Sequence, residues 1–479
     1  MSAHCHPEPA KRGEGPPDSC ASGADGRGSF AVFAAQDDSR ARPVTAPRSP
    51  SAHLFRSDSG AHLLLPNGSR VFGVDEETYA SLDALLESGD EAAIARRLTQ
   101  LGVDVPPLID DAPLVSPPLR AISLAVAQKC NLGCTYCYAQ QGDFGGPAKN
   151  MPLATALASI DLLFRDAGRG DRVNVAFLGG EPLINRPVIR AATQYALEAS
   201  RRTEAQVTFS ITTNGTLAGE DDGAFFEEHA FAVTVSIDGV GETHDALRPD
   251  RGGNGSYERV MKNVAPLLAM QKRMQVSARV TVTPRNLELR ETLDALIARG
   301  FHSVGFSPML ASPTGRDEMD DGALETMLGQ MTGCGEEFVR RTIAGERYPF
   351  ANAANALREI HKGTHRPYPC GAGAGYLGVA AGGELAACHR FVGEPAGSMG
   401  DVDGIDRGKQ NAWLDARHVH RQEPCASCWA RYLCGGGCHH EVLQRGRPAC
   451  DYVRGWLHWC LGAYATLLEK RPDWFGETA

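Results

Sequence analysis

Six apolar runs alternate with amphipathic stretches between residues 118 and 312, and this alternation limits the fold of the 479-residue chain more than any other feature. The runs are AISLAVA, VNVAFL, VTFSIT, FAVTVSI, VSARVTV and SVGFS, and stretches such as 153–166 and 257–273 separate them. Continuous apolar strands that alternate with helices are typical of a parallel sheet covered by helices. Six such units predict an α/β fold with an open or partial (β/α)6 barrel, whose ligand site lies at the carboxyl ends of the strands.

The composition of the remaining segments predicts further divisions. Residues 1–60 are rich in Pro, Gly, Ser, Ala and Arg, so we expect a disordered tail that buries too little apolar surface to order itself. Residues 61–106 show a hairpin pattern around Pro66-Asn67-Gly68 and two short amphipathic helices, which predict a small α+β module. A Pro-rich linker then leads to the barrel. The remaining boundaries are a helical linker at 313–365, a Cys-rich domain at 366–465 and a tail at 466–479.

Charge and composition exclude several classes of protein. The formal charge is −10 and no long basic stripe occurs, so we expect no nucleic-acid partner. No run of eighteen apolar residues occurs and no signal-peptide pattern opens the chain, which predicts no membrane span and a cytoplasmic location. Fourteen cysteines in a reducing compartment indicate metal ligation rather than a disulfide framework.

Three of these cysteines, Cys130, Cys134 and Cys137, directly follow the first strand of the expected barrel. Three thiolates in one loop can bind three irons of a [4Fe–4S] cluster and leave the fourth iron without a protein ligand. The alternative is a zinc loop, but closed structural zinc sites use four ligands. A C-x3-C-x2-C pattern with an aromatic residue, Tyr136, before the last cysteine resembles the radical S-adenosylmethionine (SAM) enzymes.

The segments that follow the next strands match that family in the same order. Gly179-Gly180-Glu181-Pro182 follows the second strand, Thr212-Thr213-Asn214-Gly215 ends the third, and Ser236-Ile237-Asp238-Gly239 ends the fourth. Each could instead be a simple turn. The resemblance implies reductive cleavage of S-adenosylmethionine to a 5′-deoxyadenosyl radical. It also implies that the cofactor is contacted by Tyr136, Gly179, Gly180, Glu181, Asn214, Ser236, Asp238 and Arg248.

A second group of cysteines lies toward the C-terminus: Cys370, Cys388, Cys425, Cys428, Cys434, Cys438, Cys450 and Cys460. Eight cysteines suit two fully ligated [4Fe–4S] clusters, and a pair of zinc ribbons remains open on spacing alone. These cysteines follow the radical SAM motifs in the sequence, and in that context their arrangement resembles the SPASM domain. The resemblance implies two auxiliary clusters, and thus three clusters in all. The same resemblance places Cys425, Cys428 and Cys434 in an outer set and Cys370, Cys388 and Cys438 in an inner set. Cys450 and Cys460 would complete the two sets in an unassigned order, and an open site on the inner cluster remains possible.

The residue after Cys388 helps to separate the kinds of maturase that share these domains. In sulfatase-maturing relatives an Asp follows the equivalent cysteine and serves as a base, whereas this chain has His389. The stretch CHRFVG is more similar to that of maturases that form thioether crosslinks. His389 is a candidate general base near neutral pH, and a packed structural role is the alternative.

The C-terminal stretch and the two motif sets are most similar to the maturation proteins of quinohemoprotein amine dehydrogenase. That resemblance implies thioether bonds from Cys sulfur to a carbon of Asp or Glu in a small Cys-rich peptide or subunit, with flavodoxin or ferredoxin as electron donor. The module at 61–106 is then a possible peptide-recognition element, and a capping domain is an equal alternative. Other functions left open are carbon–carbon crosslinking, formylglycine formation in sulfatases, and a non-catalytic metal-binding interaction protein.

Overall fold

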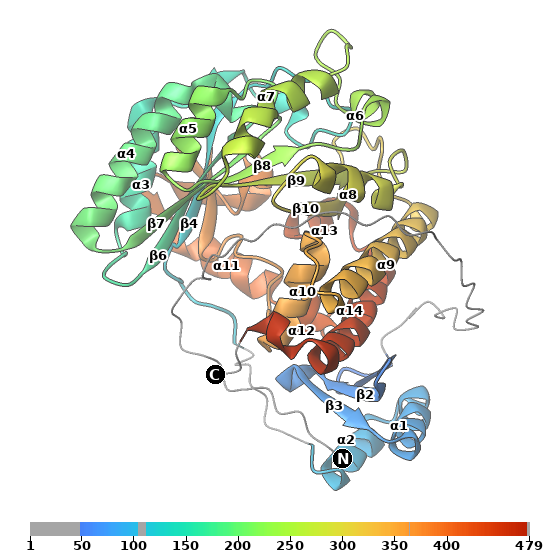
Figure 1. The fold of residues 1–479 in the computed structure, drawn as a ribbon. Helices are drawn as coiled ribbons and strands as arrows, with labels where there is room; N and C mark the ends of the chain where they lie inside the picture. The colour runs from blue at the N-terminus through green and yellow to red at the C-terminus, as the bar shows by residue number, and fades with distance from the viewer. Residues whose placement is uncertain (1–47, 104–111, 364, 477–479) are drawn as a thin grey trace, which may run out of the picture.

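The computed structural model describes residues 48–103, 112–363 and 365–476 (Figure 1). Six parallel strands form its central sheet, in the order β10-β9-β8-β7-β6-β4. They are β4 (Ala121–Gln128), β6 (Arg172–Gly179), β7 (Gln206–Thr213), β8 (Ala232–Ser236), β9 (Gln275–Val282) and β10 (Val304–Pro308). The prediction of a partial (β/α)6 barrel is confirmed, because all six strands coincide with the apolar runs and share one direction.

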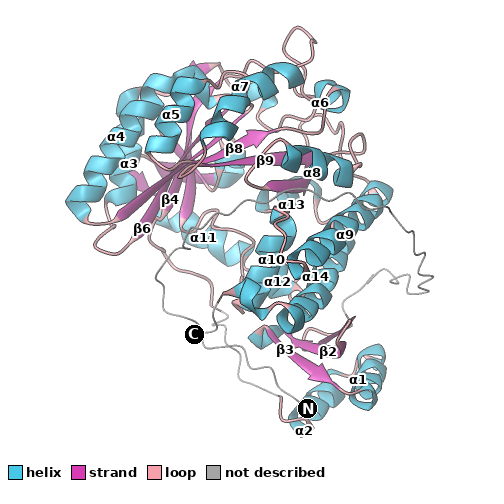
Figure 2. Cartoon of the chain, viewed as in Figure 1, coloured by secondary structure: helices cyan, strands magenta, loops and turns pink. Residues whose placement is uncertain are grey.

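Helices cover the outer face of this sheet (Figure 2). They are α3 (Leu153–Phe164), α4 (Arg186–Thr203), α5 (Glu220–Glu228), α7 (Tyr257–Met270) and α8 (Leu289–Ala298), with the short α6 (Glu242–Leu247) at the carboxyl edge. Strand β9 shows how the faces differ. Val276, Ala278, Val280 and Val282 are buried, whereas the alternate positions, among them Arg279, are partly or largely exposed. Since successive side chains of a strand point to opposite faces, these alternate residues face the inside of the barrel.

The Cys-rich region does not form a separate layer, because its first strand joins the barrel sheet. Strand β11 (Tyr376–Val379) pairs in parallel with β4, with Tyr376 opposite Ala121. Three short antiparallel strands continue the sheet from there: β12 (Glu384–Ala386), β13 (Ser398–Asp401) and β14 (Gly404–Ile405), and β5 (Lys149–Asn150) pairs with β4. The first cysteine loop and the C-terminal cysteines therefore approach each other through a shared sheet.

Helices below the barrel complete the core. The expected helical linker contains α9 (Asp321–Ile343) and α10 (Ala351–His361), and both pack against α14 (Cys450–Lys470). A Cβ at Gly335 would lie 2.2 Å from the Trp459 ring, so the glycine allows α9 and α14 to approach closely. The shorter helices are α11 (Arg407–Arg417), α12 (Arg431–Cys434) and α13 (His439–Arg445). Among the described helices, none has both the length and the apolar character needed to cross a membrane.

The segment 466–479 is not a tail over its described part. Helix α14 continues to Lys470, and a 3-10 turn spans Pro472–Phe475. Leu467 is fully buried, and Trp474 packs edge-on against Phe338 with their ring centroids 5.6 Å apart. These apolar contacts order the segment.

The N-terminal module is a small α+β unit that packs against α14 (Figure 1). Its strands are β1 (His53–Ser57), β2 (Gly60–Leu65) and β3 (Arg70–Val74), followed by α1 (Glu76–Ser88) and α2 (Glu91–Gln100). The hairpin at Pro66–Gly68 and the two helices confirm the prediction. Strand β1, however, lies inside the segment 1–60 that was expected to be disordered; residues 1–47 of that segment lie outside the described residues. The buried side chain of Phe55 explains why this strand is ordered.

Candidate active site and the three cysteine sets

The loop after β4 brings Cys130, Cys134 and Cys137 together. Burial is the main cause that raises the pKa of Cys130 and that of Cys134, the latter to about 12, and the neighbouring thiols of the loop raise both further. The Leu132 N–H donates a hydrogen bond to the Cys130 sulfur over 3.4 Å, and the Asn214 amide donates one over 3.6 Å. Such hydrogen bonds stabilise a thiolate and tune the reduction potential of a cluster that it ligates.

These thiols fit an iron–sulfur cluster better than a single ion. Within residues 48–103, 112–363 and 365–476, no three His, Cys, Asp or Glu side chains lie close enough to share one metal ion. The thiolates of a cubane each bind a different iron, so they stand farther apart than the ligands of one zinc. Burial raises the pKa of these thiols and so favours their protonated form. Coordination to a metal would remove the protons. We conclude that the first set suits a [4Fe–4S] cluster with one iron free of protein ligands.

Gly179 and Gly180 lie directly against the start of the cysteine loop. A Cβ at Gly180 would lie 2.4 Å from the Lys129 carbonyl oxygen, and one at Gly179 would lie 2.4 Å from that of Ala127. Gly179 also has a φ of 145°, which side chains rarely adopt. Only glycine therefore lets the end of β6 pack its backbone beside Cys130, where the expected cofactor contacts would be made.

Glu181, one of the expected cofactor contacts, is engaged within the protein. Its side chain is fully buried, and burial raises its pKa. The carboxylate accepts hydrogen bonds from the Asn214 N–H over 2.7 Å, from the Thr213 hydroxyl over 2.8 Å and from the Leu183 N–H over 3.0 Å. With three partners inside the chain, Glu181 ties the end of β6 to the end of β7.

Tyr136, Asp238 and Arg248 form one buried cluster. The Tyr136 hydroxyl donates a hydrogen bond to the Asp238 carboxylate, and Arg248 donates to the Tyr136 oxygen over 2.7 Å. Arg248 also lies 3.4 Å from Asp238, and the other Asp238 oxygen accepts from the Thr281 N–H over 2.8 Å. The cluster fixes the cysteine loop to the end of β8, whose last residue is Ser236. The structure thus brings all the expected cofactor residues to one edge of the sheet.

The packing of Gly180 makes a testable prediction. In the Gly180→Ala variant, the new methyl group would push the end of β6 away from the cysteine loop. A displacement of reacting groups by about 1 Å can cost about 100-fold in rate, so we expect a loss of that order in 5′-deoxyadenosine formation. The matched control is Gly168→Ala, because a Cβ there meets no atom within 4 Å. Chromatographic measurement of deoxyadenosine after reduction compares the two, and equal rates would contradict this role of Gly180.

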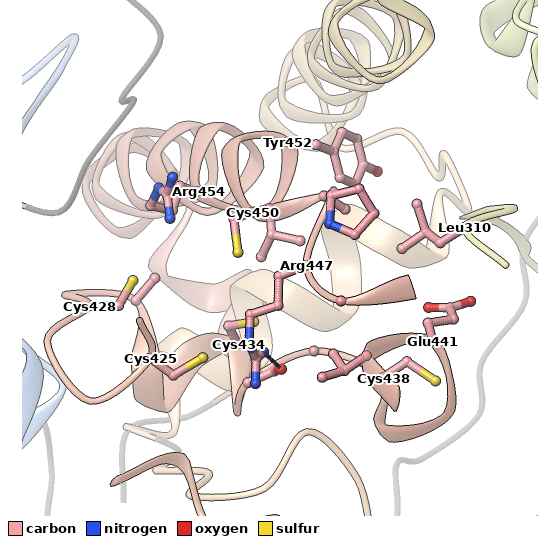
Figure 3. A pocket seen from close by; sticks show the side chains of 18 of the residues that line it. Leu310, Cys425, Cys428, Cys434, Cys438, Glu441, Arg447, Cys450, Tyr452 and Arg454 are labelled. Atoms are coloured by element: carbon pink, nitrogen blue, oxygen red, sulfur yellow. Dashed lines mark hydrogen bonds between the residues drawn. The ribbon is translucent and has the colours of Figure 1, made fainter. Parts of the chain in front are cut away.

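Five C-terminal cysteines line one cavity of about 230 Å³ (Figure 3). They are Cys425, Cys428, Cys434, Cys438 and Cys450. Burial raises the pKa of Cys425 to about 11, and the thiols of Cys434, Cys450 and Cys428 contribute to the shift. An empty apolar cavity of about 150 Å³ already holds a benzene-sized guest, so this one has room for a compact inorganic group. The outer set therefore contains four thiols, with Cys450 as the fourth, because Cys428, Cys434 and Cys450 all act on the pKa of Cys425. Cys438 acts instead on the pKa of Cys388, a member of the inner set.

The inner set contains three cysteines, Cys370, Cys388 and Cys438. Burial raises the pKa of Cys388 to about 12, and both partner thiols contribute to the shift. Cys460 does not join them. It lies fully buried within α14, and burial alone raises its pKa. The structure does not support Cys460 as a ligand, because its position on the apolar side of α14 keeps it in the core.

His389 directly follows Cys388 and is packed inside the protein. Its Nδ1 lies 2.9 Å from the Tyr376 hydroxyl, which donates a hydrogen bond to Ser123 over 2.7 Å. Burial, followed by the positive charges of Arg390 and Arg279, lowers the pKa of His389 to about 3. A group with that pKa is neutral and weakly basic near pH 7. The structure therefore favours the packed structural alternative for His389 over a general base.

A group of charged residues between the first and inner cysteine sets was not predicted from the sequence. Arg390 donates a hydrogen bond to Glu441 over 2.6 Å, and its guanidinium also lies 3.8 Å from the Cys438 sulfur. The same guanidinium stands 5.3 Å from the centre of the Tyr138 ring. Arg279 approaches this group from β9. A charged residue at an inward position of the run VSARVTV was the available signal.

Comparisons with known proteins agree with this geometry. Residues 124–296 match the Radical SAM superfamily. An uncharacterized protein from Methanocaldococcus jannaschii is 31% identical over 189 residues, which are 39% of this chain and 62% of that protein. This chain therefore spans less than two thirds of that relative. The serine-type anaerobic sulfatase-maturating enzyme of Klebsiella aerogenes is 23% identical over 357 residues, covering 70% of this chain and 84% of the enzyme.

A solved structure shares the fold. The structure of anSMEcpe with bound AdoMet superimposes with a TM-score of 0.61 at 18% identity, covering 74% of this chain and 98% of that one. The shared fold accounts for the partial barrel, and the family match covers the strands that carry the cysteine loop and the glycine turn. On these grounds residues 124–296 are similar to the Radical SAM superfamily, and the sequence relatives of the chain include an anaerobic sulfatase-maturating enzyme.

Proposed function

We propose that this enzyme joins the sulfur of a cysteine to a carbon of Asp or Glu within a small Cys-rich protein subunit, of the kind found in quinohemoprotein amine dehydrogenase. The observation that carries the proposal is the unequal division of the C-terminal cysteines. The outer set has four thiols and can saturate a cluster, whereas the inner set has three. A cluster held by three thiolates leaves one iron for a thiol from outside the chain.

The reaction balances without oxygen or any further co-reactant. When bound, S-adenosylmethionine and the first cluster supply a radical that removes a hydrogen atom from a C–H bond. Joining sulfur to that carbon replaces one C–H and one S–H bond by one C–S bond. The peptide loses a hydrogen atom to the deoxyadenosyl group, a proton to solvent or a base, and one electron. The electron acceptor, by chemical class, is an iron–sulfur cluster of the C-terminal sets.

The residues of the chain hold and position these groups. The Tyr136–Asp238–Arg248 cluster fixes the loop of the first set, and Asn214 hydrogen-bonds a sulfur of that set. Arg390 stands between the first and inner sets and contacts a sulfur of the inner one. A peptide substrate also agrees with the relatives, since anSMEcpe has been solved with bound AdoMet and the Cp18Cys peptide.

The N-terminal module is part of the proposal as a peptide-recognition element. Within the described sheet, β3 pairs only with β2, so its other edge is free to pair with an extended peptide. The module contacts the outer-set loop directly, because His53 stacks on Trp429 with ring centroids 3.6 Å apart. Arg431 also reaches across to the Pro50 carbonyl oxygen over 2.6 Å. A peptide bound along β3 would thus be held on a module that packs directly against the region with the C-terminal cysteine sets.

The test is mass spectrometry of a Cys-rich peptide from a neighbouring reading frame, co-expressed with this enzyme and then alkylated under reducing conditions. We expect the loss of two hydrogens for each modified cysteine, no alkylation of those cysteines, and no fragments between the joined residues. The matched control is co-expression with the Cys134→Ala enzyme, which should leave the peptide unchanged. Mass loss with every cysteine still alkylated would indicate carbon–carbon crosslinks instead, and an aldehyde in place of a thiol would indicate formylglycine.

A further inference from the structure

Arg279 belongs to the side of β9 that faces the inside of the barrel. It occupies an inward position of β9, and more than a third of its surface is exposed. Three other segments nevertheless surround it, because Arg390, Glu441, Cys438 and Tyr138 all lie close enough to influence its pKa. Burial is the main cause that lowers this pKa, and Arg390 lowers it further. Arg279 is accessible to solvent and yet has neighbouring side chains from three segments around it. Such a side chain faces the interior of the barrel rather than the outer surface.

The charge of Arg279 is unbalanced. In the part of the chain that the structure describes, its guanidinium forms no ion pair and no hydrogen bond. The nearby Glu441 is already paired with Arg390 over 2.6 Å. Two cations therefore share one carboxylate. An enclosed charge without a partner is costly to bury, so the site is prepared for one further anion.

The position of this unpaired charge coincides with the expected path of the substrate. Arg279 lies opposite Ser236 in the strand register, at the edge where the expected cofactor residues gather. Cys438 of the inner set and Tyr138 of the first cysteine loop are both near enough to act on its charge. A molecule in contact with Arg279 would thus lie between the first and inner cysteine sets.

We propose that Arg279 binds the side-chain carboxylate of an Asp or Glu of the substrate peptide. This inference rests on the proposed thioether chemistry and adds a reason for its choice of acidic residue. A guanidinium matches a carboxylate with two parallel hydrogen bonds, which fixes the orientation of the acidic side chain. The adjacent carbon is then held between the cofactor edge and the inner set. The carboxylate of S-adenosylmethionine has the same chemistry, so the test includes it as a separate ligand.

The test measures protection of Arg279 from an arginine-selective reagent. The full-length enzyme with its clusters is treated anaerobically with phenylglyoxal, and modification at each arginine is followed by peptide mass spectrometry. The ligands are N-acetyl-aspartate amide, N-acetyl-asparagine amide and S-adenosylmethionine, each at saturating concentration. The aspartate derivative can form charge-assisted hydrogen bonds with Arg279, so we expect it to slow the modification of Arg279 about tenfold. The asparagine derivative has no carboxylate in its side chain, so we expect little change with it. Arg96 on α2, which is exposed and unpaired among the described residues, should react equally in every sample.

Each other outcome overturns the inference. Equal protection by the aspartate and asparagine derivatives would show no recognition of a carboxylate. Protection by S-adenosylmethionine alone would assign Arg279 to the cofactor. An unreactive Arg279 in the free enzyme would contradict its exposed and unpaired state. The protection assay does not require a crosslink to form, so it can fail independently of the proposed reaction. If the aspartate derivative protected Arg279 but the co-expressed peptide stayed unmodified, the thioether reaction would be refuted and the carboxylate site would remain.

Discussion

Replacing Cys134 by Ala should abolish the formation of 5′-deoxyadenosine. Cys134 is the middle thiol of the first set, and no fourth cysteine lies in that loop to replace it. Loss of one of three ligands leaves two thiols, which cannot retain a cubane with a single open iron. We expect deoxyadenosine below detection, and the iron content should fall from about twelve to about eight atoms per chain as one of three cubanes is lost.

The control for this variant is Cys334→Ala. Cys334 is fully buried in α9 and belongs to none of the three sets. Its replacement should leave both the iron content and deoxyadenosine formation unchanged, which separates loss of a ligand from loss of folding. Retained cleavage of S-adenosylmethionine by the Cys134→Ala enzyme would refute the assignment of the first set.

Replacing Cys450 by Ala should remove the outer cluster and stop the crosslinking of the peptide. Cys450 points into the cavity that Cys425, Cys428 and Cys434 also line (Figure 3). Cys460, on the same helix, is not among the residues that line this cavity. The Cys450→Ala variant should therefore lose about four of about twelve irons. The peptide mass should then remain unchanged, since one acceptor for the electron is missing.

The matched comparison is Cys460→Ala, ten residues further along α14. This substitution removes a thiol of the same chemistry from the same helix, and we expect the full iron content and a crosslinked peptide. Iron analysis and the mass of the co-expressed peptide measure both variants. If Cys460→Ala lost iron and Cys450→Ala retained it, the division into four outer and three inner thiols would be wrong.

The length of each strand decided whether it could be predicted from the sequence. Strands such as β4 and β6 carry eight residues each, so their apolar runs stand out and their order follows from parallel topology. Strands β11 to β14 have two to four residues, too few for a pattern, and their pairing with β4 depends on contacts distant in sequence. Strand β1 was missed because its order comes from packing against α14.

The parts of the candidate site that depend on the spacing of cysteines along the chain were predictable from the sequence. The three thiols of the first loop follow from their spacing alone, and the outer and inner groups of three were also predicted. The choice between Cys450 and Cys460 was not, because both lie on one helix and only the packing of that helix decides which thiol faces the cavity. Glu181 was predicted as a cofactor contact and His389 as a candidate base or a packed residue. Hydrogen bonds and burial hold both side chains within the structure. Arg279 is the reverse case, since only the fold reveals that its charge has no partner among the residues that the structure describes.

The most direct test of the account is the metal and sulfide content of protein prepared without oxygen. Three cysteine sets that each hold a cubane predict about twelve irons and about twelve acid-labile sulfides per chain, with no zinc. Zinc without sulfide would instead indicate a metal-binding interaction protein and would contradict both the radical chemistry and the proposed crosslinking.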